Sequence, residues 1–355
     1  MKAQIKIVQS IIDNTNAKAA LLTFLPDIRW ACGFTGSNGL LLVMDGQAHF
    51  VSDGRYEAQA HQEVKGATVH IPGYNLFEYV AEEGLLDGQS PVVFQADHVT
   101  VNQLDTLKDH FPDVTWRGIE SLITEHVAAK SAAEIECIQK AQSITDEVFD
   151  YICDFIEPGI TERELAAEIV YQHLRRGAEK MSFDPIVASG PNSAFPHARP
   201  TDRTLQPNEP VLVDMGCFRD GYASDMTRTV FLGDPTETFR AVYATVLEAQ
   251  QEAIAAARAG MTGKELDAVA RDVIEEAGYG DQFSHGLGHG IGLQIHEWPK
   301  LSYHVEHDLP EGATVTIEPG IYLEGKFGVR IEDIVALNAT GNRRLTTADK
   351  TLIVV

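Results

Sequence analysis

The chain has 355 residues, 44% of them hydrophobic, and this length predicts two domains because one hydrophobic core rarely serves so many residues. A formal net charge of −24 argues against nucleic acid as a partner, since phosphate backbones are bound by clusters of Lys and Arg. No apolar stretch approaches the roughly 18 residues of a membrane span, and the opening residues lack a signal-peptide pattern, so we expect a cytoplasmic protein without a membrane partner.

The first part of the chain is expected to form an independent α/β domain. An amphipathic helix opens it, and apolar, strand-like runs follow around a turn at Gly46. These runs cover residues 20–25, 39–44 and 49–52. Further on, Ser131 and Glu134 form a capping box that begins a long helix. We therefore predict two domains, residues 1–127 and residues 128–355.

The second domain contains an internal repeat at an offset of about a hundred residues. In each half a long helix ends before a glycine, and a capping box at Thr161 or Thr262 opens the next helix. Each half then has a His-x-x-Pro sequence and an apolar strand that carries an acid. The paired residues are His197 with His296 and Asp214 with Glu318. Their common order predicts an α+β domain built by duplication, with two halves related by a pseudo-twofold axis.

The acid of the first half lies in a predicted hairpin, because two apolar, β-rich runs flank an Asp-Gly pair. If the loop is Asp220-Gly221, Asp214 lies opposite Thr227. If the loop begins one residue earlier, Asp214 lies opposite Asp225. Since side chains alternate between the two faces of a sheet, both registers put the two aspartates on the same face.

The second half repeats this arrangement. A three-residue loop at residues 324–326 would set Glu318 opposite Glu332, again on one face. Pro319 removes a ladder donor beside Glu318, so we expect a bulge at this position.

Four acids in apolar strands require an explanation, because an unpaired buried carboxylate is costly. Each acid alone could face solvent or pair with Arg228 or Arg330. Two such hairpins in duplicated positions make that explanation weaker, since crowded like charges are stable only around cations or shared protons. The pattern therefore predicts a divalent metal centre.

The glycine-rich segment at residues 284–296 supplies imidazoles. A lone histidine is more often a satisfied core residue, but His285, His289 and His296 stand close together among glycines that let the backbone approach a metal centre. We therefore assign this segment to the site.

From residue 130 to the end, the chain resembles the metallopeptidases of the creatinase or pita-bread fold, which include methionine aminopeptidase, prolidase and aminopeptidase P. The resemblance implies a pita-bread second domain with five metal ligands. These are Asp214 in Val-Asp-Met-Gly, Asp225 in Ser-Asp-Met-Thr-Arg-Thr, His289 in Gly-His-Gly, Glu318 in Ile-Glu-Pro-Gly and Glu332 in Arg-Ile-Glu-Asp.

By this resemblance, Asp225 and Glu332 bridge two divalent ions, Asp214 completes one ion, and His289 and Glu318 complete the other. The oxygen-rich donor set suits Mn²⁺ best, with Co²⁺, Zn²⁺ and Fe²⁺ as alternatives. Two such ions activate a water and polarise the scissile carbonyl. Glu318 is implied to shuttle the proton as well.

Four further residues are implied to line the substrate site. His197 and His296 match family positions that contact the substrate and steady the intermediate, and His285 matches another pocket histidine. Without the resemblance, His197 could equally be a residue of a proline-flanked turn. Arg330 matches an arginine near the metal carboxylates, although it could be a simple salt-bridge partner.

Two motifs of the first domain, Gly-Phe-Thr-Gly-Ser-Asn-Gly at residues 33–39 and Ser-Asp-Gly-Arg-Tyr at residues 52–56, are similar to the creatinase-like domain of aminopeptidase P and prolidase. Methionine aminopeptidase lacks that domain, and creatinase lacks the metal ligands. We therefore expect a peptidase that cleaves before proline in a proline-containing peptide. The residues of these two motifs favour an Xaa-Pro aminopeptidase (aminopeptidase P), with Xaa-Pro dipeptidase (prolidase) as the alternative.

A catalytically silent pita-bread module that binds peptides is a further alternative, but such relatives usually lack metal ligands and this chain retains all five. The resemblance also implies a homodimer or a larger homo-oligomer, since the family's first domain commonly rims a neighbour's active site. Arg29 or Trp30 would then act across that interface.

Overall fold

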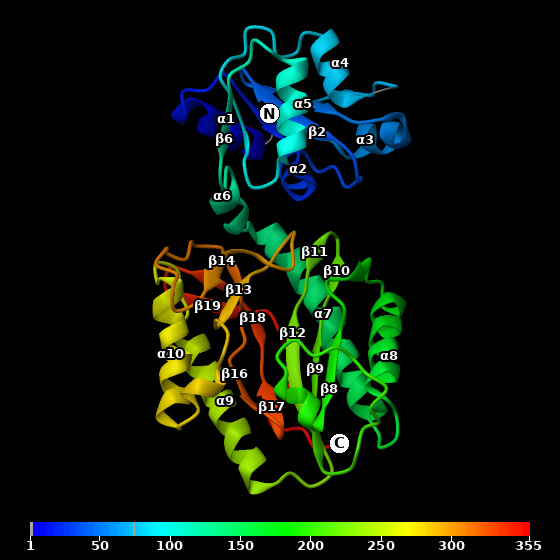
Figure 1. The fold of residues 1–355 in the computed structure, drawn as a ribbon, viewed down its shortest axis with the longest axis vertical. Coiled ribbons are helices and arrows are strands. Elements are labelled where there is room, and N and C mark those ends of the chain that lie inside the picture. Colours follow the sequence, from blue (N-terminus) through cyan, green and yellow to red (C-terminus); the bar gives the residue numbers. More distant parts are fainter. Residues whose placement is uncertain (1–2, 74) are drawn as a thin grey trace. The chain divides into compact units, whose positions relative to one another are not determined.

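The computed structural model describes residues 3–73 and 75–355 (Figure 1). Contacts between Cα atoms divide the chain into two compact units, Met1–Val127 and Ala128–Val355, and each unit has hydrophobic clusters of its own. Among the described residues, no helix combines the length and the apolar character that crossing a bilayer requires.

The first unit is an α/β fold around one six-stranded sheet of order β4-β3-β2-β1-β5-β6. The strand β2 runs antiparallel to both of its neighbours, and the other pairs are parallel. The strands are β1 (Ala19–Leu22), β2 (Leu40–Met44), β3 (Gln47–Val51), β4 (Thr68–His70), β5 (Val92–Gln95) and β6 (Trp116–Ile119). The helices up to the unit boundary are α1 (Ala3–Asn14), α2 (Leu25–Cys32), η1 (Gly54–Tyr56), α3 (Glu57–Glu63), α4 (Leu76–Glu82), α5 (Val101–His110) and α6 (Thr124–Ala128).

The predicted turn at Gly46 is confirmed, since Asp45 and Gly46 have φ of 48° and 73° and join β2 to β3. The first apolar run is shorter than expected as a strand. It ends at Leu22 because a proline in the first turn of α2 favours a helix start at Leu25. Trp30 is only 6% exposed and Arg29 is partly exposed, so Arg29 is the better placed of the two for an interface, which stays a prediction.

The second unit contains two helix pairs, and Figure 1 shows its strands between them. The helices are α7 (Ala132–Phe155), α8 (Glu162–Arg175), η2 (Gly190–Ala194), α9 (Glu237–Ala256), α10 (Gly263–Glu276) and η3 (Gly280–Gln282). The predicted capping boxes at Ser131, Thr161 and Thr262 are all present. Each of these side chains accepts a hydrogen bond from the backbone three residues on, which explains why the helices begin there.

Four small sheets lie between the helix pairs, with orders β12-β9-β8, β11-β10-β7, β14-β13-β15-β18-β19 and β16-β17. The strands of the first half are β7 (Lys180–Met181), β8 (Ile186–Ser189), β9 (Glu209–Met215), β10 (Cys217–Arg219), β11 (Tyr222–Ala223) and β12 (Met226–Leu232). Those of the second half are β13 (Gly288–Gly290), β14 (Glu297–Leu301), β15 (Thr314–Ile317), β16 (Gly320–Leu323), β17 (Phe327–Arg330), β18 (Asp333–Asn338) and β19 (Gly341–Arg344).

The first hairpin adopts the first of the two predicted registers. Asp220 and Gly221 form the two-residue turn with φ of 51° and 73°, and Asp214 lies opposite Thr227. The strand ladder is interrupted just before β12, so the N–H of Asp225 points instead to Gln142 Oε1 at 3.4 Å.

The second hairpin has the predicted three-residue loop, since Leu323 pairs with Phe327. The ladder stops at Glu318 and Glu332 and resumes beyond them in the same register, so the expected bulge is replaced by an interruption. Within it, the N–H of Glu318 donates to Leu287 O at 2.9 Å, and the N–H of Glu332 donates to Thr227 O at 3.1 Å. Asp225, Glu318 and Glu332 thus stand at interruptions of the hairpin ladders, whereas Asp214 lies within the regular ladder of β9.

Candidate metal centre

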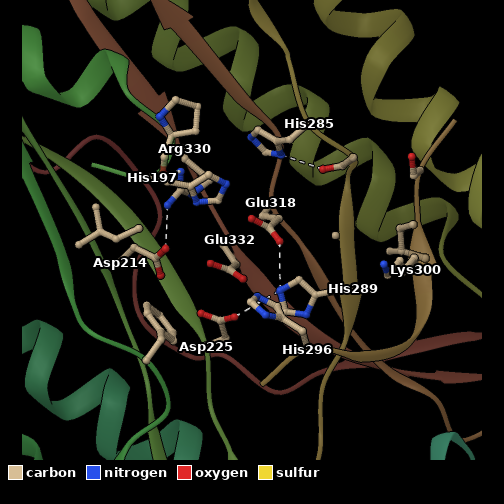
Figure 2. Close-up of a pocket in the computed structure, with 17 residues that line it drawn as sticks. His197, Asp214, Asp225, His285, His289, His296, Lys300, Glu318, Arg330 and Glu332 are labelled. Atoms are coloured by element: carbon tan, nitrogen blue, oxygen red, sulfur yellow. Dashed lines mark hydrogen bonds and ion pairs between the residues drawn. The ribbon is translucent and has the colours of Figure 1, made fainter. Parts of the chain in front are cut away.

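One cavity of about 650 Å³ in the second unit gathers every side chain that the sequence predicted for the site (Figure 2). The residues come from both halves of the duplicated domain. They are Asp214, Asp225, His289, Glu318 and Glu332, together with His197, His285, His296 and Arg330.

Three of the predicted metal ligands lie close enough together to hold one ion. Asp225, His289 and Glu332 each offer a ligand atom, and these atoms lie within 4.8 Å of one another. His289 Nε2 also lies 3.5 Å from Asp225 Oδ2 and 3.4 Å from Glu318 Oε1. The imidazole Nδ1 faces Gly290 O at 3.1 Å, so the proton belongs on Nδ1 and Nε2 is free to act as a ligand.

Two carboxylate oxygens in the cavity have no hydrogen-bond partner among the described residues. They are Asp214 Oδ1 and Glu332 Oε1, and both are buried. A buried carboxylate oxygen without a donor is costly unless a cation contacts it. A set of four acids and one imidazole with unsatisfied oxygens therefore fits divalent metal ions.

The pKa values of the acids also fit a site for divalent metal ions. Burial raises the pKa of Asp225 well above its usual range, and the neighbouring Glu332 and Asp214 raise it further. Burial also raises the pKa of Glu332, with Glu318 adding to it. Burial raises the pKa of Glu318 to about 7, although the Arg330 guanidinium opposes this shift. In the absence of a cation, these acids would thus hold protons at a pH where ordinary carboxyls are ionised.

Arg330 makes hydrogen bonds through all three of its guanidinium nitrogens. It donates from Nη2 to Asp214 Oδ2 at 2.7 Å, from Nε to Thr227 Oγ1 at 3.0 Å, and from Nη1 to the Tyr322 hydroxyl at 2.8 Å and to Pro196 O at 3.1 Å. Because four of the five guanidinium N–H groups are engaged within the protein, these contacts indicate that Arg330 orients Asp214.

His285 continues the same chain of contacts. Its Nδ1 lies 2.8 Å from Gly286 O and its Nε2 lies 2.9 Å from the Tyr322 hydroxyl. Burial lowers the pKa of His285 to about 4, so the ring is neutral, donates from Nδ1 and accepts from Tyr322. Tyr322 was missed in the sequence, although strand alternation places it on the same face as Arg330.

Two threonines that the sequence analysis did not assign to the site hold the glutamates. Thr227 Oγ1 donates to Glu332 Oε2 at 2.8 Å. Thr316 Oγ1 accepts from the N–H of His289 at 3.0 Å and donates to Glu318 Oε1 at 3.1 Å. Thr227 and Thr316 stand two residues from predicted acids and hence on the same strand faces, which is the signal that could have identified them.

The remaining predicted histidines line the cavity around the acids. The ring of His296 meets that of His289 edge-on, with centroids 4.4 Å apart and planes at 83°. His197 enters the cavity from the opposite half of the domain, on the segment that follows β8 (Figure 2).

Lys300 is a lining residue that the sequence analysis missed. It lies on β14, four residues after His296, and among the described residues its ammonium has no ion-pair or hydrogen-bond partner. Figure 2 shows it on the far side of the acids from Asp214. Sequence alone gave no reason to separate this lysine from surface lysines.

Comparison with protein families identifies both units. Residues 4–126 match the Creatinase/Prolidase N-terminal domain, and residues 136–339 match metallopeptidase family M24.

Similar proteins cover nearly the whole chain. A Xaa-Pro dipeptidase of Pyrococcus furiosus is 35% identical over 99% of this chain and 100% of its own length. A solved structure titled Xaa-Pro dipeptidase from Bacillus anthracis has a TM-score of 0.96 at 36% identity and covers 99% of both chains. An X-Pro aminopeptidase structure from Thermotoga maritima has a TM-score of 0.92 at 35% identity, over 98% of this chain and 100% of that chain. The chain therefore belongs to metallopeptidase family M24, with the pita-bread fold and the creatinase-type first domain that its sequence predicts.

Proposed function

We propose that this protein is an Xaa-Pro dipeptidase that works with two divalent metal ions. The observation that carries the proposal is a cavity in which a cluster of buried acids with unbonded oxygens faces an unpaired lysine. The relatives named Xaa-Pro dipeptidase support this substrate class, so the preference for aminopeptidase P that the sequence motifs suggested gives way to its alternative.

In this proposal five side chains hold the ions, and Asp225 and Glu332 are shared between them. Asp214 belongs to one ion, and His289 and Glu318 belong to the other. The excess of oxygen donors favours Mn²⁺ or Co²⁺ over ions that prefer sulfur. Bound divalent ions would supply an activated water and a polarised scissile carbonyl.

Glu318 is the residue best suited to move protons. Its carboxylate stands among the proposed ligands, 3.4 Å from His289 Nε2, where it can reach a water that the ions would bind. We propose that its carboxylate takes the proton of the attacking water and passes it to the proline nitrogen. That nitrogen has no N–H in the substrate and must gain a proton to leave as an amine.

We propose that His197 and His296 contact the substrate on either side of the scissile bond. Burial lowers the pKa of His296, so at neutral pH its ring is uncharged and can donate one hydrogen bond to a developing negative charge. His285 has a positioning role in this proposal, because its Nε2 is already engaged with Tyr322.

Lys300 accounts for a preference for dipeptides. The proline of a dipeptide carries a free carboxylate, and the ammonium of Lys300 at the exposed rim of the cavity can bind it by a charge-assisted hydrogen bond. The free amine of the first residue would then lie toward Asp214, on the other side of the acids (Figure 2). A longer peptide has no carboxylate at this point and gains nothing from the lysine.

The test compares Ala-Pro with Ala-Pro-Ala in the wild type, Lys300→Met and Lys300→Arg. We expect the wild type to prefer the dipeptide. Because a hydrogen bond to a charged group contributes about 1.5–3 kcal/mol, Lys300→Met should raise KM for Ala-Pro by about 10- to 100-fold, and Lys300→Arg should restore most of the loss. The rate on Ala-Pro-Ala should change little.

The second candidate is an Xaa-Pro aminopeptidase, which the similarity to the Thermotoga maritima enzyme favours. Efficient cleavage of Ala-Pro-Ala by the wild type, with no effect of Lys300→Met on Ala-Pro, would support it and refute the dipeptidase proposal. Failure to cleave either peptide with Mn²⁺ present would leave a peptide-binding module as the explanation.

A further inference from the structure

Glu162, the first residue of α8, is a buried carboxylate that takes no part in the metal centre. It is completely shielded from solvent, and both of its oxygens accept several hydrogen bonds. The donors to Oε1 are the backbone N–H and hydroxyl of Ser189, at 2.8 Å each, and Asn192 Nδ2 at 3.1 Å. The donors to Oε2 are the backbone N–H of Thr201 at 3.0 Å, the Thr201 hydroxyl at 2.6 Å and Asn192 Nδ2 at 3.2 Å.

These donors belong to the two ends of one segment. Ser189 is the last residue of β8, Thr201 stands twelve positions later, and the chain between them carries His197 into the cavity. One carboxylate therefore ties together the two stems of the loop that holds a pocket histidine. Since Asn192 lies within this loop, Glu162 also reaches its interior.

The rest of the loop is held from the other half of the domain. The N–H of Gly328 donates to Ser193 Oγ at 2.9 Å, and Arg330 Nη1 donates to Pro196 O at 3.1 Å. The His197 side chain itself has no hydrogen-bond partner among the described residues. Its position in the cavity thus depends on its backbone, which is fixed at the stems by Glu162.

We propose that Glu162 is a positioning residue that holds His197 at the substrate, and this inference rests on the proposed function. The geometry of one buried acceptor with donors from both stems carries it. A histidine that must approach a scissile bond loses its effect when its backbone shifts by a fraction of an ångström, because orientation contributes strongly to rate.

The duplicated half shows that this carboxylate is not required by the helix start. Thr262 opens α10 with the same capping box, yet Gly263 occupies the position that corresponds to Glu162. In that half His296 is followed by Glu297, whose buried side chain pairs with Lys130. The two pocket histidines are thus supported by two different buried carboxylates.

Replacement by glutamine is a sharp test because an amide cannot be accommodated. Either orientation of a glutamine would turn its NH₂ group toward the backbone N–H of Ser189 or of Thr201, and two donors repel. Glu162→Gln should therefore release one stem of the loop while it leaves the volume of the side chain unchanged.

The experiment is a double-mutant cycle with Glu162→Gln and His197→Ala in the full-length, Mn²⁺-loaded protein, assayed on Ala-Pro. We expect Glu162→Gln to lower kcat/KM by about 10- to 100-fold in the wild-type background. In the His197→Ala background the same change should have an effect of about twofold or less, because Glu162 acts on the rate only by positioning the His197 side chain. Metal content should equal that of the wild type in all variants.

Glu164→Gln is the matched control, since Glu164 lies on the same helix, is exposed, and serves only the capping box. It should leave kcat/KM unchanged. If Glu162→Gln does not fold, Thr201→Val removes one of the donors and should give a smaller loss that also disappears in the His197→Ala background.

Equal losses from Glu162→Gln with and without His197 would overturn the positioning role, and so would an unchanged rate for Glu162→Gln. Absence of Ala-Pro cleavage by the wild type would instead refute the proposed function, so the two failures are distinguishable.

Discussion

At the scale of single residues, the proposed metal centre is marked by two acids that each have only one hydrogen-bonded carboxylate oxygen. Asp214 has Arg330 on one oxygen, and Glu332 has Thr227 on one oxygen, while the second oxygen of each acid has no donor among the described residues. Donors on one side fix the orientation of a carboxylate and leave the other side available, which is how outer contacts prepare a metal ligand.

A first prediction concerns Glu318 in the metal-free protein. Its pKa is about 7 in the folded state against the usual 4.5, so between these pH values the folded state binds the proton more tightly than the unfolded state. The associated stability is fully present below about pH 4.5 and is lost as the pH rises toward 7. The glutamine of Glu318→Gln does not ionise, so this pH-dependent loss of stability is absent from the variant.

The metal-free Glu318→Gln variant should therefore gain stability relative to the wild type between pH 4.5 and 7. The gain is at most about 3 kcal/mol, and 17% exposure of the Glu318 side chain reduces it. Urea unfolding at several pH values in a chelator measures the difference. A difference that stays constant with pH would show that the pKa of Glu318 is not raised.

Residue types in alternating strands were sufficient to predict that the acids share a face, because side-chain alternation is a local rule. Tyr322 and Thr316 were not predicted, although alternation puts them on the faces of Arg330 and Glu318. Their hydrogen-bond partners and the place of Lys300 in the cavity depend on which strands lie side by side in space, and alternation within one strand carries no information about that.

At the scale of elements, the two hairpins place three of the four acids, Asp225, Glu318 and Glu332, at interruptions of their ladders. The Asp220-Gly221 turn fixed the first register, and the three-residue loop fixed the second, so both could be predicted. The interruptions could not be predicted, because the N–H groups of Glu318 and Glu332 are taken by Leu287 and Thr227, which belong to other elements.

The start of β14 is held by a buried ion pair between Lys130 and Glu297, whose side chains are 1% and 5% exposed. The exposed pair of Lys140 and Asp220 provides a comparison. Lys130→Met should lower the free energy of unfolding by about 3–5 kcal/mol, since it leaves a buried charge unpaired. Lys140→Met should change it by about 0–1 kcal/mol.

Chemical unfolding of the two variants measures this difference. The double variant Lys130→Met, Glu297→Met should recover much of the loss, because no buried charge then remains. Similar stability of Lys130→Met and Lys140→Met would contradict the assignment of the ion pair as buried.

At the scale of the whole molecule, duplication brings acids from two hairpins to one point, and histidines from both halves line the same cavity. The sequence repeat predicted the duplication in the second unit, and the alternating helix and strand patterns predicted the α/β character of the first unit. It did not reveal that unlike residues support the two histidines, since Glu162 and Gly263 occupy corresponding positions.

The assembly state remains a prediction from the family resemblance. We expect a homodimer or a larger homo-oligomer, with a mass of at least twice the 38.9 kDa of the chain. Sedimentation equilibrium at micromolar concentration measures it. A monomeric mass would contradict the expectation and would mean that each chain forms a complete active site by itself.

The most direct test of the metal centre is the number of Mn²⁺ ions bound per chain, measured by elemental analysis after equilibrium dialysis of the wild type and of Asp225→Asn. Because Asp225 is proposed to contact both ions, we predict two tightly bound ions in the wild type and loss of both in the variant. A wild type that binds no manganese, or a variant that retains two ions with undiminished affinity, would contradict the account.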